Sequence, residues 1–242
     1  TLSFDLRNSI NWQCLRGENP ESVNRLIITA SGGPFRQAST DTLKKVSASD
    51  ALQHPSWSMG AKITIDSATM LNKAFEIIEA YWLFNIPAHR IVPIVHPQSI
   101  VHSMVEFNDG SIKAQLGVPD MRLPIAYALG ETVRLAGAER PLNFSEMSNL
   151  TFEEPDTERF PCINLAYHAL ERRGNTACII NAANEIAVAA FLAGRIKFLD
   201  IYELIIKALE NIPYISTPTI EDYMECNSET RNFTENLIHS NY

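Results

Sequence analysis

The sequence predicts an α/β (α+β) domain with a mixed sheet, followed by an all-α C-terminal domain that resembles a four-helix bundle. Two observations support this fold class. Strand and helix patterns alternate in the first half, and from Cys162 onward the pattern is helical only. The length of 242 residues and the hydrophobic fraction of 45% allow one large domain or two small ones with buried cores.

Short runs rich in β-branched residues predict the strands of the first half. The run that ends at Ala30 is followed by Ser31-Gly32-Gly33, which indicates a tight turn with exposed backbone N–H groups. Asn108-Asp109-Gly110 is a strong hairpin signal between two later runs. The expected strands are Arg25–Ala30, Ile63–Ile65, Arg90–Val95, Ile100–Phe107 and Ser111–Leu116.

Apolar residues at helical spacing predict the helices. In the first half we expect a short polar helix at Thr40–Ser49 and a longer one at Ala68–Phe84, with Asp66-Ser67 as its N-cap. The core stripe of the longer helix would be Leu71, Phe75, Ile78 and Trp82. The C-terminal helices are expected at Cys162–Arg173, Thr176–Ala193, Asp200–Asn211 and Ser228–His239.

Glycines and acidic residues indicate where the C-terminal helices begin and end. Gly174 and Gly194 fit the position just after a helix, and Asp200 with Glu203 has the spacing of a capping box. Short connections between four helices indicate an antiparallel bundle. The chain would thus divide into residues 1–130 with the sheet, a connector at 131–160 that crosses the surface, and a helical domain at 161–242.

Composition excludes several classes of protein. A net charge of −8 repels phosphate backbones, so we expect no nucleic-acid partner. The apolar region Thr176–Ala193 is interrupted by Asn181, Asn184 and Glu185, so it predicts a buried helix and no membrane span. The four cysteines form no C-x-x-C pair, and the chain opens without a signal peptide, so we expect reduced thiols in a cytoplasmic protein.

The densest group of candidate functional residues lies at the start of the helix predicted after Asp66. Asn72 and Lys73 lie four and three positions before Glu76, so the three side chains project from one helix face. An amide, a cation and a carboxylate together can hold a phosphorylated substrate and a divalent metal. The alternative is a surface Lys73–Glu76 pair worth about 0.2–0.5 kcal/mol, and spacing alone favours that alternative.

Weaker candidates lie in loops and at strand ends. Ser31-Gly32-Gly33 could cradle a phosphate, although most such turns are only turns. His54 opens a loop that also carries Trp57 and Met59, which is either a lid or a loop packed on its own domain. A lone histidine at a strand end, such as His96, is more often structural than catalytic.

Read together, four blocks of the first half and one of the C-terminal half resemble the deoxyxylulose phosphate reductoisomerase family. They follow the order of that family from about Leu26 to the end of the chain, and they are long and specific. The blocks are ITASGGPFR (Ile28–Arg36), HPSWSMGAKITIDSATMLNKAFEIIEAYWLF (His54–Phe84), VHPQSIVHSMVEFNDGS (Val95–Ser111), AQLGVPDMRLPIAYAL (Ala114–Leu129) and NAANEIAVAAFL (Asn181–Leu192).

The resemblance implies a homodimeric enzyme that converts 1-deoxy-D-xylulose 5-phosphate to 2-C-methyl-D-erythritol 4-phosphate with NADPH and Mg²⁺ or Mn²⁺, in non-mevalonate isoprenoid biosynthesis. Residues 1–130 would be its catalytic domain, binding substrate and metal and forming the dimer. The implied substrate-binding residues are Ser31, His54, Trp57, Ser67, Asn72 and Lys73. The implied catalytic residues are Lys73 and His102, the cofactor-binding residues Met59 and Met121, and the metal ligands Glu76 and Asp5.

The sequence departs from the family in two places. The NADPH-binding Rossmann-type domain at the start of the family has no counterpart here, so we expect this chain alone to be inactive. The family's Asp-Ser-Glu-His metal run is replaced by Asp5-Leu6-Arg7-Asn8, where Arg7 puts a cation in place of a carboxylate. Two alternatives stay open: a non-catalytic binding or dimerisation module, and a metal-dependent sugar-phosphate isomerase that needs no nicotinamide.

Overall fold

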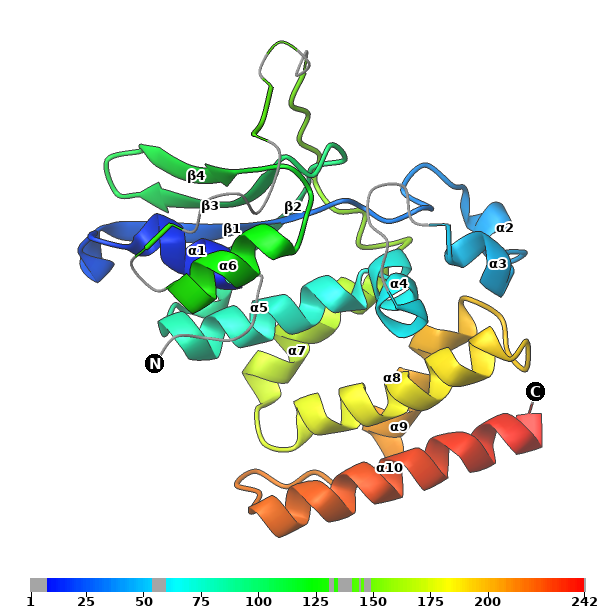
Figure 1. Ribbon diagram of the computed structural model, residues 1–242. Coiled ribbons are helices and arrows are strands. Elements are labelled where there is room, and N and C mark those ends of the chain that lie inside the picture. Colours follow the sequence, from blue (N-terminus) through cyan, green and yellow to red (C-terminus); the bar gives the residue numbers. More distant parts are fainter. Residues whose placement is uncertain are drawn as a thin grey trace. The chain divides into compact units, whose positions relative to one another are not determined.

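The computed structural model describes residues 8–53, 60–130, 133–134, 141–143, 145 and 149–241. The chain forms two compact units, and each is discontinuous in sequence. The first unit contains 8–32 and the described part of 73–156; the second contains 33–53, 60–72 and 157–241. The sequence instead divides the chain into three consecutive ranges with boundaries at residues 130 and 160, and that division stays a prediction. The predicted fold class is confirmed: a mixed sheet with helices, then a helical C-terminal region (Figure 1).

The sheet of the first unit has four strands in the order β2-β1-β3-β4. The central strand β1 (Val23–Ala30) pairs in parallel with β2 (Ile91–Val95) and antiparallel with β3 (Val101–Phe107). β4 (Ile112–Leu116) forms the other edge, antiparallel to β3. The sheet is therefore mixed, as the sequence predicts.

The hairpin between β3 and β4 forms where Asn108-Asp109-Gly110 predicts it. Gly110 has φ +81°, which a residue with a side chain adopts only at a cost. The Asp109 side chain accepts a hydrogen bond from the Ser111 backbone N–H at 2.9 Å. Along β3, alternate residues are buried, so His102 lies on the more exposed face of the sheet.

Two helices replace the strand and the single helix expected between residues 63 and 84. α4 (Ala61–Ala68) contains the segment Ile63–Ile65 that was expected to be a strand, and α5 (Leu71–Phe84) follows after a break. The break lies at Met70, which has φ +63°. The strand prediction was wrong because three residues with a high β-propensity also fit one turn of a helix, and buried Ile65 packs in such a turn here. Asp66 lies in the last turn of α4 and is not an N-cap.

The buried face of α5 differs from the expected stripe. Leu71 and Ile78 are buried as predicted, but Trp82 is 66% exposed. Ala74 and Ile77 are buried in its place. The steps of four, three and four keep Trp82 within about 20° of Leu71 around the helix axis, so its exposure depends on what packs against the last turn and not on its place around the helix.

Short segments connect the larger elements. In the first unit these include the 3₁₀ turns η1 (Pro20–Ser22) and η2 (Ala88–Arg90). In the second unit, the region expected as one polar helix forms two single turns, α2 (Thr40–Leu43) and α3 (Ala48–Ala51). A serine caps each turn, and the caps divide the segment into two helices.

Two helices pack beside the sheet in the first unit. α1 (Asn8–Leu15) lies against β3 and β4, and α6 (Arg122–Gly130) lies next to α1. Trp12 and Tyr127 join these helices with ring centroids 5.6 Å apart. α1 is also linked to α5 by a hydrogen bond from Asn8 to Glu79.

The helices of the C-terminal region agree with the sequence in number and order. α8 packs against both α9 and α10 (Figure 1). α8 ends at the predicted glycine: Gly194 has φ +72°, and the N–H groups of Gly194 and Arg195 bond to the carbonyls of Phe191 and Ala190, which is a Schellman motif. The elements are η4 (Pro161–Asn164), α7 (Leu165–Arg172), α8 (Thr176–Leu192), α9 (Asp200–Asn211) and α10 (Ile220–Asn241).

The helix starts in this region differ from the expected ones. Asp200 accepts a hydrogen bond from the Lys197 backbone N–H, so the expected capping box with Glu203 does not form. Instead, Thr219 and Asp222 form a reciprocal pair of bonds at the start of α10, at 3.1 and 2.8 Å. α10 therefore begins eight residues before Ser228, the start expected from the sequence.

Other features follow from burial. The four cysteines are free, and three of them are buried. His96 is fully buried and its Nδ1 lies 2.9 Å from the Thr151 carbonyl oxygen, which is the structural role expected of it. Among the helices of the described residues, none is both long and apolar enough to cross a membrane.

Candidate functional site

Most of the described candidate residues lie on the consecutive helices α4 and α5. The Thr69 N–H bonds to the Ile65 carbonyl and ends α4, and the Thr69 hydroxyl donates to the Asp66 carbonyl at 3.2 Å. Met70 then turns the chain with its positive φ, and α5 begins. Ser67 therefore lies in the last turn of one helix, whereas Asn72 lies in the first turn of the next.

The glycine-rich turn packs directly on the end of α4. Gly33 has φ +67°, and a Cβ atom built there would lie 2.9 Å from the Ser67 carbonyl oxygen and 3.1 Å from the Ala68 Cα. Only a residue without a side chain allows this approach. Ser31 precedes Gly33 by two residues, so its Cα lies within about 7.6 Å of the Gly33 Cα. Within the second unit, Gly33 of the turn thus lies in contact with Ser67.

Lys73 and Glu76 form a buried ion pair on α5. Lys73 Nζ lies 2.5 Å from Glu76 Oε2, and each residue is 5% exposed. The surface pair considered from the spacing is therefore excluded. Removing a charged side chain from water costs roughly several kcal/mol per ion, and the attraction within the pair offsets only part of this. A buried ion pair is therefore weak evidence that the pair stabilises the fold. It is stronger evidence for a functional site, where buried charges are common.

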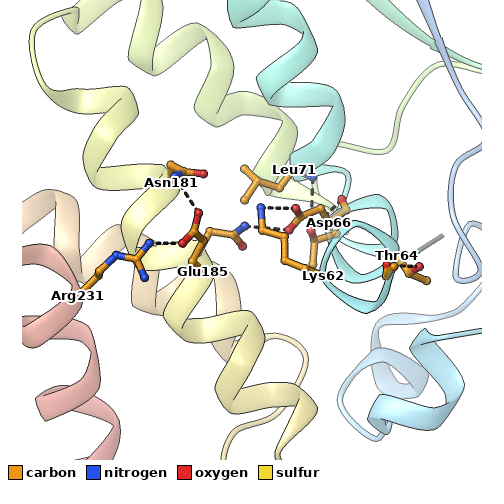
Figure 2. A network of polar contacts seen from close by, with 10 residues as sticks. Lys62, Thr64, Asp66, Leu71, Asn181, Glu185 and Arg231 are labelled. Atoms are coloured by element: carbon orange, nitrogen blue, oxygen red, sulfur yellow. Dashed lines mark hydrogen bonds and ion pairs between the residues drawn. The ribbon is translucent and has the colours of Figure 1, made fainter. Parts of the chain in front are cut away.

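Asp66, next to Ser67, is a second buried charge, and sequence reasoning missed it. It is 3% exposed, and its carboxylate lies 2.7 Å from Lys62 Nζ and accepts a hydrogen bond from Asn184 Nδ2 at 2.8 Å (Figure 2). Burial raises the pKa of Asp66 because it penalises the carboxylate, and the Lys62 and Asn184 contacts oppose that effect.

The polar network continues from α8 to α10. Glu185 accepts a hydrogen bond from Asn181 at 3.2 Å and forms an ion pair with Arg231 (Figure 2). Partial burial opposes ionisation of Glu185, but Arg231 and Asn181 lower its pKa below the ordinary value. The polar residues that interrupt the apolar run of α8 are thus members of this network, and their sequence signal was the interruption itself.

His102 and Met121 lie in the first unit. The His102 carbonyl accepts a hydrogen bond from the Thr29 hydroxyl at 2.8 Å, which ties this part of β3 to β1. A Cβ atom built on Gly117 would lie 3.4 Å from His102 Nε2, so the imidazole packs on the chain just after β4. Met121 is half-buried and directly precedes α6.

Four predicted site residues lie outside the described part of the chain. They are Asp5, His54, Trp57 and Met59. The lid function expected of the loop and the metal role expected of Asp5 stay predictions.

The predicted metal site was tested against the donor groups of the described residues. Mg²⁺ requires near-octahedral oxygen ligands and usually one or two carboxylates together with water or substrate oxygens. Within the described ranges, no group of three or more histidine, cysteine, aspartate or glutamate residues could hold a metal ion. Glu76 supplies one carboxylate, and Lys73 occupies one of its oxygens. The described residues alone therefore do not compose a metal site.

Comparison with known proteins identifies the class of these domains. Residues 2–84 match the model of the 1-deoxy-D-xylulose 5-phosphate reductoisomerase C-terminal domain, and residues 116–233 match that of the DXP reductoisomerase C-terminal domain. The 1-deoxy-D-xylulose 5-phosphate reductoisomerase of Bacteroides thetaiotaomicron is 50% identical over 237 residues, which are 98% of this chain and 61% of that protein. That of Caldanaerobacter subterraneus subsp. tengcongensis is 51% identical over 231 residues, 95% of this chain and 60% of that protein.

Solved structures agree with the sequence comparison. The reductoisomerase from Zymomonas mobilis in complex with NADPH has a TM-score of 0.90 and 44% identity, over 98% of this chain and 61% of that one. A DOX-P reductoisomerase in complex with NADPH, fosmidomycin and magnesium has a TM-score of 0.91 and 37% identity, over 98% of this chain and 63% of that one. The chain belongs to the 1-deoxy-D-xylulose 5-phosphate reductoisomerase family. It spans about three fifths of the length of the relatives it matches.

Proposed function

We propose that this chain is the substrate-binding and helical part of an enzyme that converts 1-deoxy-D-xylulose 5-phosphate to 2-C-methyl-D-erythritol 4-phosphate, with NADPH and Mg²⁺ or Mn²⁺, in non-mevalonate isoprenoid biosynthesis. The observation that carries the proposal is the buried Lys73–Glu76 pair at the start of α5. The 50% identity to named reductoisomerases supports the reaction.

The first role of these residues is to anchor the substrate phosphate. Ser31 and Ser67 would offer hydroxyl groups, Asn72 an amide and Lys73 a cation, and charge-assisted hydrogen bonds to an anion are the strong ones. The phosphate is remote from the reacting carbons, so its binding energy holds the reacting end in register. Lys73 would then lie between two anions, the Glu76 carboxylate and the phosphate.

The second role is to shape the reacting end of the site. NADPH, when bound, would supply the hydride that reduces the rearranged carbon skeleton. Met121 would pack near the nicotinamide, and Met59 would lie beside it. His102 would face the carbon skeleton, and Trp57 and His54 would exclude water from it. Glu76 would contribute one metal ligand, with Asp5 as a further candidate.

The two alternative functions receive less support. A binding or dimerisation module without catalysis does not account for a buried pair of a lysine and a carboxylate. A metal-dependent isomerase without a nicotinamide does not account for the close likeness to reductoisomerases solved with NADPH.

The test of the phosphate site is titration of the chain with inorganic phosphate, followed by NMR of the backbone amides. We expect weak binding that shifts the amides near Lys73 and is lost in Lys73→Ala. Because that variant leaves Glu76 buried without its partner, Lys73→Met with Glu76→Gln serves as a second, charge-balanced variant. The matched control is Lys44→Ala, since Lys44 forms an exposed pair with Asp41. Unchanged affinity in both Lys73 variants would show that the pocket lies elsewhere.

Catalysis and metal binding have separate tests. We expect no NADPH oxidation by the chain alone with deoxyxylulose phosphate and Mn²⁺, because no Rossmann-type nucleotide-binding sequence is recognisable in it. Turnover of about 1 per second or faster would contradict this. With so few anionic ligands we also expect weak Mn²⁺ binding, and a tight stoichiometric site in calorimetry would refute that expectation.

We further propose a homodimer in the cytoplasm, with a sugar-phosphate substrate and neither nucleic acid nor membrane as partner. The edge strand β4 supports the dimer, since a partner's sheet could extend it and Ile112 on this strand is 52% exposed. Sedimentation of the chain at micromolar concentration should show the dimer, and Ile112→Asp should weaken it. A monomer at all concentrations would contradict the proposal.

A further inference from the structure

The end of α4 is held by a helix that is distant in sequence. Asn184 on α8 donates to the Asp66 carboxylate across 118 positions of sequence, and both residues lie in the second unit. Asn184 is fully buried and Asp66 is 3% exposed. Water therefore cannot replace this hydrogen bond without entering the packed interface between the two helices.

This arrangement is costly, which argues for a purpose other than stability. Burial raises the pKa of Asp66, because the low-polarity surroundings disfavour its ionised carboxylate. The Asn184 Oδ1 atom is also buried, and within the described residues it has no hydrogen-bond partner. A pair of apolar residues would fill the same place without these costs, and unpaired buried polar atoms in native proteins call for an explanation.

The bond acts at the end of a short helix. α4 has eight residues, and Gly60 at its start provides no side-chain cap. At its end, the Asp66 carbonyl accepts a hydrogen bond from the Thr69 hydroxyl. The next residue, Met70, has a positive φ and ends the helical path. A hydrogen bond to the Asp66 side chain thus fixes the turn that carries Ser67 and that leads into Asn72.

We propose that Asn184 is a positioning residue for substrate binding: through Asp66 it holds the end of α4, so that Ser67 and Asn72 keep the geometry that a phosphate group requires. The proposal rests on the assignment of the phosphate to Ser67 and Asn72. Asn184 itself touches no substrate. Substrate affinity would therefore depend on α8, the central helix of the C-terminal region.

The network around Asn184 supplies a matched control. Asn181 lies one turn earlier on α8 and donates to Glu185, not to Asp66. Both asparagines are amides on the same helix, so replacing either by alanine makes the same chemical change. The two variants differ in whether the end of α4 loses a hydrogen bond.

The first measurement is hydrogen–deuterium exchange of the ligand-free chain. We expect Asn184→Ala to accelerate exchange at residues 65–72, whereas Asn181→Ala leaves these residues unchanged. The second measurement is titration with inorganic phosphate. Asn184→Ala should weaken phosphate affinity on the order of tenfold, the factor that corresponds to one lost hydrogen bond, and Asn181→Ala should not.

The outcomes separate this proposal from the proposed function. Unchanged exchange at residues 65–72 in Asn184→Ala overturns the positioning role, whether or not phosphate binds. If the wild-type chain does not bind phosphate but Asn184→Ala still accelerates exchange, the positioning of α4 stands and the assignment of the phosphate to Ser67 and Asn72 fails. Faster exchange with unchanged phosphate affinity overturns the proposal.

A second pair of variants covers the case in which Asn184→Ala does not fold. Asp66→Asn keeps an oxygen that can accept from Asn184, whereas Asp66→Ala removes it. We expect Asp66→Asn to retain phosphate affinity and exchange protection close to the wild-type values, and Asp66→Ala to lose both. Equal losses in the two variants would show that the charge matters and the hydrogen bond does not, and would overturn the proposal.

Discussion

Replacing Gly33 by alanine should destabilise the second unit by about 2–5 kcal/mol. The backbone at Gly33 has φ +67°, and a residue with a side chain costs about 1–2 kcal/mol in that region. The added Cβ would also lie 2.9 Å from the Ser67 carbonyl oxygen, and relieving such a contact in a packed site costs typically about 1–3 kcal/mol. The two costs have different origins, so a control can separate them.

Gly194→Ala is that control. Gly194 also lies in the second unit and has φ +72°, but a Cβ atom there would meet nothing within 4 Å. It therefore shares the conformational cost and lacks the contact. Urea unfolding followed by far-ultraviolet circular dichroism should show Gly33→Ala less stable than Gly194→Ala by about 1–3 kcal/mol. Equal destabilisation in the two variants would mean that the turn does not pack on α4 as described.

Three further predictions concern the core, a helix start and a buried thiol. Ile77→Ala should lower the unfolding free energy by about 2–5 kcal/mol, because Ile77 is fully buried. Trp82→Ala in the monomer should lower it far less, because Trp82 is exposed. Equal losses in the two variants would contradict the described burial. Thr219→Ala should cost about 1 kcal/mol through loss of the α10 cap, measured by thermal unfolding against Thr217→Ala, which should be nearly neutral. Burial raises the pKa of Cys162 to about 12, so its neutral thiol stabilises the fold below pH 9 and that contribution is lost as pH rises toward 12. Between pH 9 and 12 the unfolding free energy of the wild type should fall, relative to that of Cys162→Ala, by up to about 1.4 kcal/mol per pH unit. If the unfolding free energies of the two proteins change in parallel with pH, the raised pKa of Cys162 is refuted.

Features set by local sequence were predicted well. The β3–β4 hairpin follows from Asn108-Asp109-Gly110, whose short loop and glycine allow few alternatives. The end of α8 follows from Gly194, which closes a Schellman motif. In both cases the decisive interactions join residues close in sequence, and a residue pattern records them directly.

Features that depend on distant contacts were predicted poorly. The β-branched run Ile63–Ile65 fits a strand or a helical turn, and its packing in α4 decides between them. Trp82 continues the apolar pattern of α5, yet it is exposed, because the spacing along a helix does not record where the packing against that helix ends. The pairing of Asp66 with Asn184 crosses 118 positions, and no local spacing encodes it.

The candidate site shows the same division. The sequence predicted that Lys73 and Glu76 interact, because three positions on a helix determine their proximity. It did not predict that the pair is buried, which depends on the elements packed around α5. It also identified Asn184 only as an interruption of an apolar run, whereas the structure makes it a partner of the helix that carries Ser67.

The discontinuity of the second unit has a consequence for synthesis on the ribosome. This unit draws on residues 33–53 and 60–72 from early in the chain and on 157–241 from late in it. Asp66 precedes Asn184 by 118 positions, so at typical elongation rates α4 waits roughly 6–24 s for its partner helix. An isolated eight-residue helix is not stable in water, and during that interval the apolar face of α4 is exposed to chaperones and proteases. A premature stop codon between the end of α5 and the start of α8 would therefore leave Ser67 and Asn72 in the polypeptide and yet deprive them of the fold that gives them a function.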